Sequence, residues 1–195
     1  MNLWDGGILA GAEHRALDEA LLLQAEQPTL RWYRWTRAEI SFGYPMRWAD
    51  VSPRLEGREA VRRWTGGGLV EHGDDLTIAI AVPKNDRPNL EAPLAFYERV
   101  HRAITDSLDF TARLATSDDC SCGPACFDNP AQFDVLREGR KIAGGAIRRS
   151  REGLLYQGSI QGVEIPGDFI QRLARNLAEH STPWTPSGEL LRHAG

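Results

Sequence analysis

The chain has 195 residues, of which 42% are hydrophobic and 26% charged, and its formal net charge is −4. This composition is typical of a globular domain with a sizeable core, so we expect a single domain over residues 1–195. The acidic balance argues against a nucleic-acid partner, because surfaces that follow phosphates are basic. No apolar run reaches about 18 residues and no signal peptide is visible, so the sequence predicts no membrane association and a cytoplasmic location.

Hydrophobic spacing and turn residues divide the chain into alternating helices and strands. The almost wholly apolar run 76–82 is the clearest predicted strand, and we expect it to be buried. The predicted elements, in chain order, are a helix over 13–26, strands over 30–35 and 40–44, a short helix or loop over 51–57, strands over 59–63 and 76–82, a helix over 89–108, strands over 133–136, 140–147 and 154–160, and a final helix over 167–179 with a partly loose tail.

The long helix over 89–108 carries one apolar face. Helical spacing places Leu94, Tyr97, Val100, His101 and Ile104 on that face. A histidine in such a position is expected at the edge of the core and not as a ligand.

A glycine-rich segment, Arg62-Arg63-Trp64-Thr65-Gly66-Gly67-Gly68-Leu69-Val70-Glu71-His72, lies between the predicted strands 59–63 and 76–82. Three consecutive glycines indicate a positive φ or a ligand that lies against bare backbone, and two upstream arginines favour an anionic ligand. The alternative is a hairpin with solvated arginines. The segment is not followed by a helix, so it differs from the usual nucleotide-binding fingerprints.

Two further side chains are candidates for chemistry. Lys141 stands on the predicted strand 140–147 beside small residues, where it can grip a carboxylate, phosphate or polarised carbonyl; the alternative is an edge lysine that only aids solubility. Cys126 lies in a polar loop, where a nearby cation would make it a competent nucleophile; the alternative is an inert free thiol.

Cysteines at 120, 122 and 126 form a compact group. An odd number without an export signal argues against a disulfide framework. Three thiolates without a nearby histidine make an incomplete tetrahedral zinc set, so we expect no metal site.

The motif R-R-x-T-G-G-G-x-V-x-H over 62–72, G-R-K-I-A-G-G-A over 139–146 and Q-G-S-I over 157–160 occur in this order. Together they resemble the superfamily of lipoate–protein ligases, octanoyltransferases and biotin–protein ligases, and the similarity extends over about residues 12–180. The resemblance implies an α+β fold, with a mixed, largely antiparallel sheet packed with helices, like the class II aminoacyl-tRNA synthetases. It implies one catalytic domain without an accessory C-terminal domain.

Within this superfamily, the segment 125–130 is similar to the cysteine segment of octanoyl-acyl carrier protein:protein octanoyltransferases. The resemblance makes Cys126 the acyl-accepting nucleophile and Lys141 the cation that lowers its pKa. No cofactor is then required. The acyl group passes from octanoyl-acyl carrier protein to a lysine of a glycine-cleavage H protein or of a 2-oxoacid dehydrogenase lipoyl domain.

The resemblance also identifies the residues that line the acyl-chain tunnel and its carbonyl end. Backbone amides near Gly68 and Gly144 are expected to stabilise the oxyanion, and Arg63 and His72 to shape the loop. The expected substrate-binding residues are Arg63, Gly66, Gly67, Gly68, Leu69, Val70, His72, Gly144, Gly145 and Ala146.

Two alternatives remain open at this point. In a lipoate–protein ligase, Arg63, Gly68, Leu69 and Lys141 would hold an acyl-adenylate made from lipoate with ATP and Mg²⁺, and a separate polypeptide would supply the accessory domain. A non-catalytic member would only bind lipoyl-domain proteins. The chain departs from the family pattern at Gly145, where a serine is frequent, and at Gln157, where a histidine is frequent.

Overall fold

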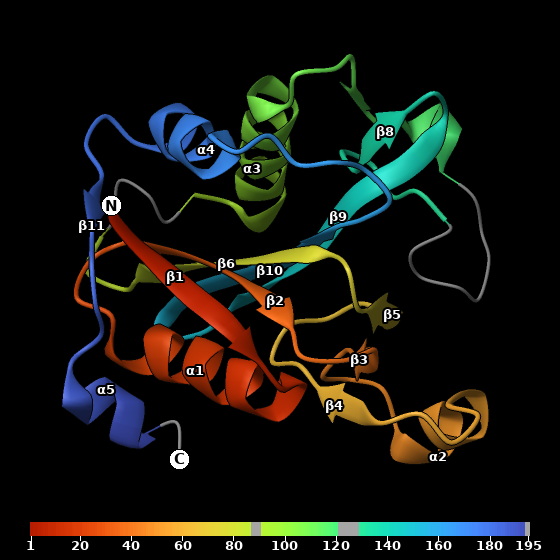
Figure 1. Ribbon diagram of the computed structural model, residues 1–195, viewed down its shortest axis with the longest axis horizontal. Coiled ribbons are helices and arrows are strands. Elements are labelled where there is room, and N and C mark those ends of the chain that lie inside the picture. Colours follow the sequence, from red (N-terminus) through yellow and green to blue (C-terminus); the bar gives the residue numbers. More distant parts are fainter. Residues whose placement is uncertain (87–90, 121–128, 194–195) are drawn as a thin grey trace.

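The computed structural model describes residues 1–86, 91–120 and 129–193 and is built around one large sheet (Figure 1). Its strand order is β11-β1-β2-β6-β10-β9-β8-β7. The pairs β11–β1 and β1–β2 are parallel and the others antiparallel. This confirms the mixed, largely antiparallel sheet. The strands are β1 (Asn2–Leu9), β2 (Thr29–Trp35), β6 (Leu76–Pro83), β7 (Arg113–Leu114), β8 (Val135–Arg137), β9 (Arg140–Arg149), β10 (Gly153–Ile160) and β11 (Thr182–Pro183).

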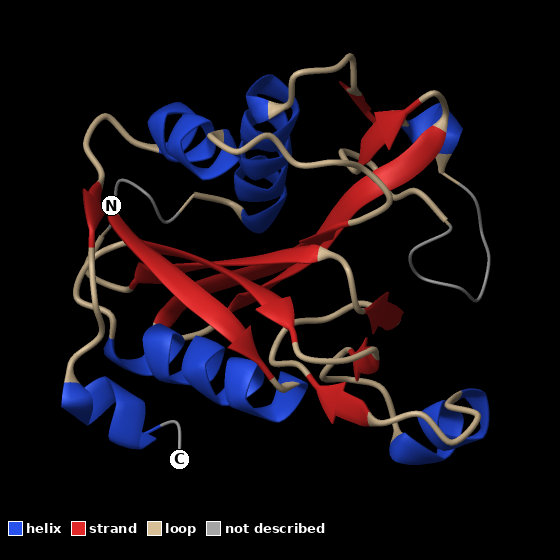
Figure 2. Ribbon diagram, in the orientation of Figure 1, coloured by secondary structure: helices blue, strands red, loops and turns tan. Residues whose placement is uncertain are grey.

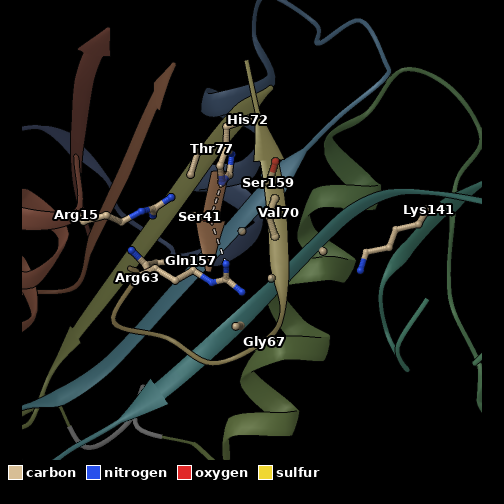
Figure 3. Close-up of a pocket in the computed structure, with 14 residues that line it drawn as sticks. Arg15, Ser41, Arg63, Gly67, Val70, His72, Thr77, Lys141, Gln157 and Ser159 are labelled. Carbon is tan, nitrogen blue, oxygen red and sulfur yellow. Dashed lines mark hydrogen bonds between the residues drawn. The ribbon is translucent and has the colours of Figure 1, made fainter. Parts of the chain in front are cut away.

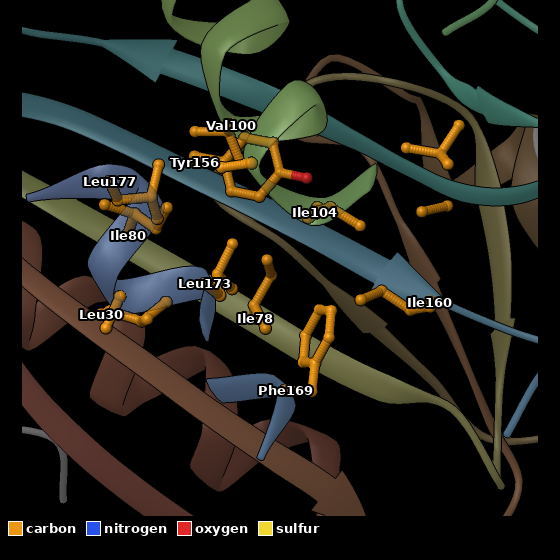
Figure 4. Packing of buried hydrophobic residues seen from close by; sticks show 14 of the residues in the cluster. Leu30, Ile78, Ile80, Val100, Ile104, Tyr156, Ile160, Phe169, Leu173 and Leu177 are labelled. Atoms are coloured by element: carbon orange, nitrogen blue, oxygen red, sulfur yellow. The ribbon is translucent and has the colours of Figure 1, made fainter. Parts of the chain in front are cut away.

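Helices cover both faces of this sheet (Figures 1 and 2). On one face lie α3 (Pro93–Ser107) and α4 (Phe169–Leu177), and on the other lie α1 (Gly11–Gln24) and α5 (Gly188–His193). Every residue of β6 and β10 is therefore buried, as the apolar run in β6 predicts. Figure 4 shows the cluster under α3 and α4, in which Ile78, Tyr156 and Leu173 meet.

A second, three-stranded sheet lies beside the ends of β2 and β6 (Figure 1). Its order is β4 (Ala60–Arg62), β3 (Glu39–Phe42) and β5 (Leu69–His72), and its small core is closed by α2 (Trp48–Val51) and the 3-10 turn Ser52–Arg54. Both outer strands pair with β3, so the glycine-rich loop 63–68 joins the two edges of one small sheet.

Most predicted elements are present, with several corrections. The strands β1, β5, β7 and β11 and the helix α5 were not expected, and α4 is not the last helix, because β11 and α5 follow it. Leu94 was assigned to the buried face of α3, but it is 58% exposed. The helix begins at Pro93, since proline suits a first helical turn, and residues 89 and 90 of the predicted range lie outside the described residues. His101 was expected at the edge of the core, but it is fully buried.

Among the described residues, no helix is long and apolar enough to cross a membrane.

Candidate active site

The glycine-rich loop is held by its own arginine. The Arg63 guanidinium donates to the carbonyls of Gly66 and Gly68, each at 2.8 Å from Nη2, and to the Ser41 hydroxyl at 3.1 Å. Gly67 has φ +84°, and a Cβ there would lie 2.7 Å from Arg63 Nη2. The glycines therefore let the loop close around a buried guanidinium, which fixes its shape.

A hydrogen-bonded chain connects β3, β5 and the turn before β6. His72 contacts Asp75 through Nδ1 at 2.9 Å and the Ser41 hydroxyl through Nε2 at 2.7 Å. Burial lowers the pKa of His72 to about 4, so the ring is neutral near pH 7. Burial opposes ionisation of Asp75, but the hydrogen bond from His72 prevails and lowers its pKa to about 2. An ionised carboxylate only accepts, so His72 donates from Nδ1 and Nε2 accepts from Ser41.

Asp75 also accepts hydrogen bonds from the hydroxyls of Ser159 at 2.6 Å and Thr77 at 2.8 Å. Trp35 stacks on His72 with ring centroids 3.9 Å apart and donates to Thr77. This wall of the site is therefore held together by hydrogen bonds that converge on Asp75.

Lys141 lies on β9 and is paired with a buried carboxylate. Its Nζ is 2.8 Å from Asp134 Oδ2, and the two side chains are 9% and 1% exposed. Tyr97 donates to the other oxygen of Asp134 at 2.5 Å and accepts from the backbone N–H of Gly145 at 3.0 Å. A Cβ on Gly144 would lie 2.3 Å from Lys141 Cε, so the small residue noted in the sequence makes room for the lysine.

A second buried cluster joins α1 to β2. Arg31 is fully buried and donates to Asp18 Oδ1 at 2.7 Å, whereas Arg15 approaches Asp18 Oδ2 at 3.3 Å and donates to the Tyr33 hydroxyl at 2.8 Å. Gln157 donates to Asp18 Oδ2 at 2.6 Å. Two guanidinium groups thus share one carboxylate.

These groups surround one pocket of about 50 Å³, which has room for a narrow ligand (Figure 3). In Figure 3, Lys141 and Arg15 lie at opposite ends, with Ser41, Arg63 and Gln157 between them. The pocket is lined by Arg15, Ser41, Arg63, Gly67, Val70, His72, Thr77, Lys141, Gly144, Gly145, Ala146, Gln157, Gly158 and Ser159.

The structure brings most of the predicted site residues to this pocket. Eight of them line it, namely Arg63, Gly67, Val70, His72, Lys141, Gly144, Gly145 and Ala146. Gly66, Gly68 and Leu69 belong to the same loop and strand but are not among the lining residues. Cys126, the predicted nucleophile, lies outside the described residues, as does Cys122. The described part of the chain contains no group of three or more metal-ligating side chains suited to a metal ion.

Sequence reasoning did not identify Arg15, Ser41, Thr77 or Ser159 as site residues, and it noted Gln157 only as a departure from the family pattern. Arg15 and Asp18 are three positions apart on a helix, which is the spacing of a surface ion pair. The sequence feature that could have pointed to this cluster is Arg31, a basic residue within β2, a strand made mostly of large apolar residues.

The fold and the sequence both match characterised proteins. The family model described as the lipoyl protein ligase A/B catalytic domain matches residues 10–176. The octanoyltransferase LipM of Oceanobacillus iheyensis is 32% identical over 187 residues, which is 86% of this chain and 67% of that protein. The octanoyltransferase LipM of Carboxydothermus hydrogenoformans is 34% identical over 164 residues, 77% of this chain and 61% of that protein. The chain therefore matches about two thirds or less of the length of these relatives.

Two solved structures share the fold at low sequence identity. Lipoate-protein ligase A bound with ATP superposes with a TM-score of 0.77 at 18% identity, covering 99% of this chain and 92% of that one. A lipoate protein ligase-like protein of T. acidophilum with bound lipoic acid gives 0.76 at 20% identity, with the same coverage. With the family model matched over most of its length, the chain belongs to the lipoyl protein ligase A/B catalytic domain family.

Proposed function

We propose that this protein is an acyltransferase of protein lipoylation, which moves an octanoyl or lipoyl group from an acyl carrier protein to a lysine of a lipoyl domain. The observation that carries the proposal is the position of Lys141, an ammonium group held by Asp134 at one end of a narrow pocket. The similarity to octanoyltransferases over most of the chain supports it.

In the first step, the Cys126 thiolate attacks the carbonyl carbon of the carrier thioester. A new C–S bond forms to Cys126, and the carrier thiol leaves and takes a proton. In the second step, the neutral amine of the acceptor lysine attacks the carbonyl carbon of the acyl-enzyme. A C–N bond forms, the nitrogen loses one proton to solvent, and the C–S bond breaks to release the Cys126 thiolate. A thiolate serves as both nucleophile and leaving group, which is why no activated adenylate is needed.

Lys141 suits the role of the cation that stabilises this thiolate. Ala131, five positions after Cys126, donates its backbone N–H at 2.7 Å to Asp134 Oδ2, the oxygen that also contacts Lys141. The segment that follows Cys126 in sequence is therefore tied to the same carboxylate as the proposed stabilising cation. The expected acceptors are a glycine-cleavage H protein and the lipoyl domain of a 2-oxoacid dehydrogenase.

Lipoate–protein ligase activity with ATP and Mg²⁺ is the second candidate, because an ATP-bound ligase shares this fold. The hydrogen bonds of Arg63 indicate how well the site would accommodate an adenylate. Its guanidinium donates to two loop carbonyls and to Ser41, so an adenylate phosphate would have to displace bonds that shape the loop. This arrangement favours the transferase.

Intact-mass analysis distinguishes the candidates. After incubation with octanoyl-acyl carrier protein, the wild type and Cys120→Ala should gain one octanoyl group and pass it to an added lipoyl domain, whereas Cys126→Ala should not. Cys120 is the matched control, since it is an exposed thiol. Normal transfer by Cys126→Ala would refute the covalent mechanism. Modification of the acceptor only with ATP, Mg²⁺ and free lipoate would establish the ligase, and binding without turnover in both assays would indicate a non-catalytic member.

A further inference from the structure

Arg15 is a buried cation that the transfer chemistry does not use. Arg15 is 4% exposed, lines the pocket, and lies at the end opposite Lys141 (Figure 3). Its hydrogen bonds to Asp18 and Tyr33 both come from Nη1. Nε is fully buried and has no hydrogen-bond partner. A buried donor without an acceptor is costly, so this guanidinium is incompletely satisfied by the protein alone.

The charge of Arg15 is also incompletely balanced. Asp18 is the carboxylate it contacts, and the closer bond of Asp18, 2.7 Å, goes to Arg31. Arg31 is further enclosed by the rings of Trp4 and Tyr33, at 4.7 and 4.3 Å from its guanidinium carbon. One carboxylate thus serves two guanidinium groups, and of the two only Arg15 reaches the pocket.

Among the described residues, Asp18 is the only carboxylate within ion-pair distance of Arg15. Burial, followed by the field of Arg31, lowers the pKa of His14 to about 4, so His14 carries no charge near pH 7. Asp75 is ionised, but it accepts hydrogen bonds from His72, Thr77 and Ser159 and forms no ion pair with Arg15. Arg15 also lies over the Trp35 ring at 5.1 Å, which is a weaker partner than a carboxylate.

Among the described residues, few apolar side chains line the pocket between its two ends. Val70 and Ala146 are its only apolar side chains, and the others are charged, amide, hydroxyl, imidazole or glycine. A methyl-terminated chain that reached Arg15 would cover the cation without compensating it, which is unfavourable. A carboxylate at the same place would accept charge-assisted hydrogen bonds and balance the excess cation.

We propose that Arg15 makes this pocket selective for acyl groups whose far end carries a carboxylate. The preferred donor is then the monothioester of a dicarboxylic acid, with the thioester at the Lys141 end and the free carboxylate at Arg15, and an octanoyl group is a poorer occupant. This inference rests on the proposed function, because it assigns the substrate class of the same site.

Two unreactive amides differ only at the end in question and serve as probes. Octanamide and suberamic acid have the same chain length and the same neutral amide, but only suberamic acid ends in a carboxylate. Calorimetric titration of the wild type should give a dissociation constant about tenfold to a hundredfold lower for suberamic acid, as expected for a charge-assisted hydrogen bond. Equal affinities, or tighter binding of octanamide, would overturn the proposal.

Variants assign the preference to this residue. Arg15→Met should lose most of the preference and retain octanamide binding, Arg15→Lys should keep part of it, and Arg172→Met should leave it unchanged. Arg172 is an arginine on α4 that pairs with Asp168 far from the pocket lining. An unchanged affinity ratio in Arg15→Met also overturns the proposal. If Arg15→Met fails to fold, the wild-type ratio and Arg15→Lys still decide.

The same samples separate this inference from the proposed function. A protein that forms the octanoyl adduct on Cys126 but shows no preference for suberamic acid refutes only the role of Arg15. A protein that prefers suberamic acid but is never acylated by the octanoyl or the suberyl carrier thioester refutes only the transferase.

Discussion

The two ends of the pocket handle charge in different ways. At the β9 end, Lys141 is paired with Asp134, its own carboxylate, at 2.8 Å. At the α1 end, Arg15 and Arg31 share Asp18. A matched pair is satisfied within the protein, so it can orient a reacting group without demanding an anion. An unmatched cation leaves part of its stabilisation to the ligand, which is how a site selects for charge.

The largest effect should come from removing the shared anion. Asp18→Asn keeps the shape of the side chain but leaves two buried guanidinium groups without a carboxylate. We expect the free energy of unfolding to fall by about 3–5 kcal/mol, the usual cost of breaking a buried pair. Urea unfolding followed by tryptophan fluorescence measures this loss.

The matched control is Asp168→Asn, which removes an exposed carboxylate paired with Arg172 at 2.8 Å. Solvent screens such pairs, so its unfolding curve should coincide with that of the wild type. Equal, small effects of the two substitutions would show that the α1 end does not depend on Asp18 for charge balance.

Lowering the pH should destabilise the folded protein at both ends of the pocket, because each end contains a buried histidine that is neutral in the folded state. Burial lowers the pKa of His101, beside Asp134 and Lys141, to about 4, and the pKa of His14 is similarly low. Between the unfolded value of 6.5 and about pH 4, the unfolded chain binds a proton that the folded chain does not. The contribution of each neutral histidine to the free energy of unfolding is therefore fully present above pH 6.5. It decreases from pH 6.5 towards pH 4, with a slope of about 1.4 kcal/mol per pH unit for each histidine.

Unfolding curves between pH 7 and pH 4 test this at each end separately. His14→Gln and His101→Gln should each reduce the slope of the free energy of unfolding against pH by the contribution of one proton. This holds even if the substitution also lowers the stability at pH 7. A slope that is unaffected by both substitutions would mean that neither histidine is held neutral in the folded state.

The two ends were not equally predictable from the sequence. Lys141 could be identified because the hairpin around Glu138 and Gly139 has a clear turn signal, and the glycines after the lysine indicated space beside it. Arg15 could not be identified in this way. The sequence of a helix indicates which residues three and four positions away are neighbours, but it does not indicate which strand packs against the helix. Arg15 is buried by Tyr33 and Trp35, which come from a strand beyond the helix.

The strand β1 was missed for a related reason. An aspartate followed by two glycines is typical of a turn, but Gly6 is needed within the strand, since a Cβ there would lie 2.7 Å from Arg31 Nε. The register shift between Asp5 and Ile8 accommodates the same segment. Gly6 is therefore required because the buried Arg31 on the neighbouring strand β2 packs against it. This is a tertiary contact, which local sequence patterns do not show.

The smallest stability change should come from one of two glycines on the neighbouring strands β9 and β10. A Cβ on Gly158 would lie 2.1 Å from the Tyr156 hydroxyl, a fully buried group that also contacts His101, so Gly158→Ala should cost about 1–3 kcal/mol by overpacking. A Cβ on Gly144 would meet the flexible end of Lys141.

Gly144→Ala should cost less, about 1 kcal/mol, because the flexible Lys141 chain can change rotamer and keep its ammonium group within ion-pair range of Asp134. Its effect should appear in catalysis instead, since it shifts the ammonium group within the site without removing any charge. We expect the rate of Cys126 acylation to fall at least about tenfold, the effect of losing one well-placed electrostatic contact, while the suberamic acid preference stays. A variant as unstable as Gly158→Ala would show that Lys141 cannot move aside. A normal acylation rate would show that the position of Lys141 does not matter for transfer, and the contrast between a reacting end and a selecting end would then lose its basis.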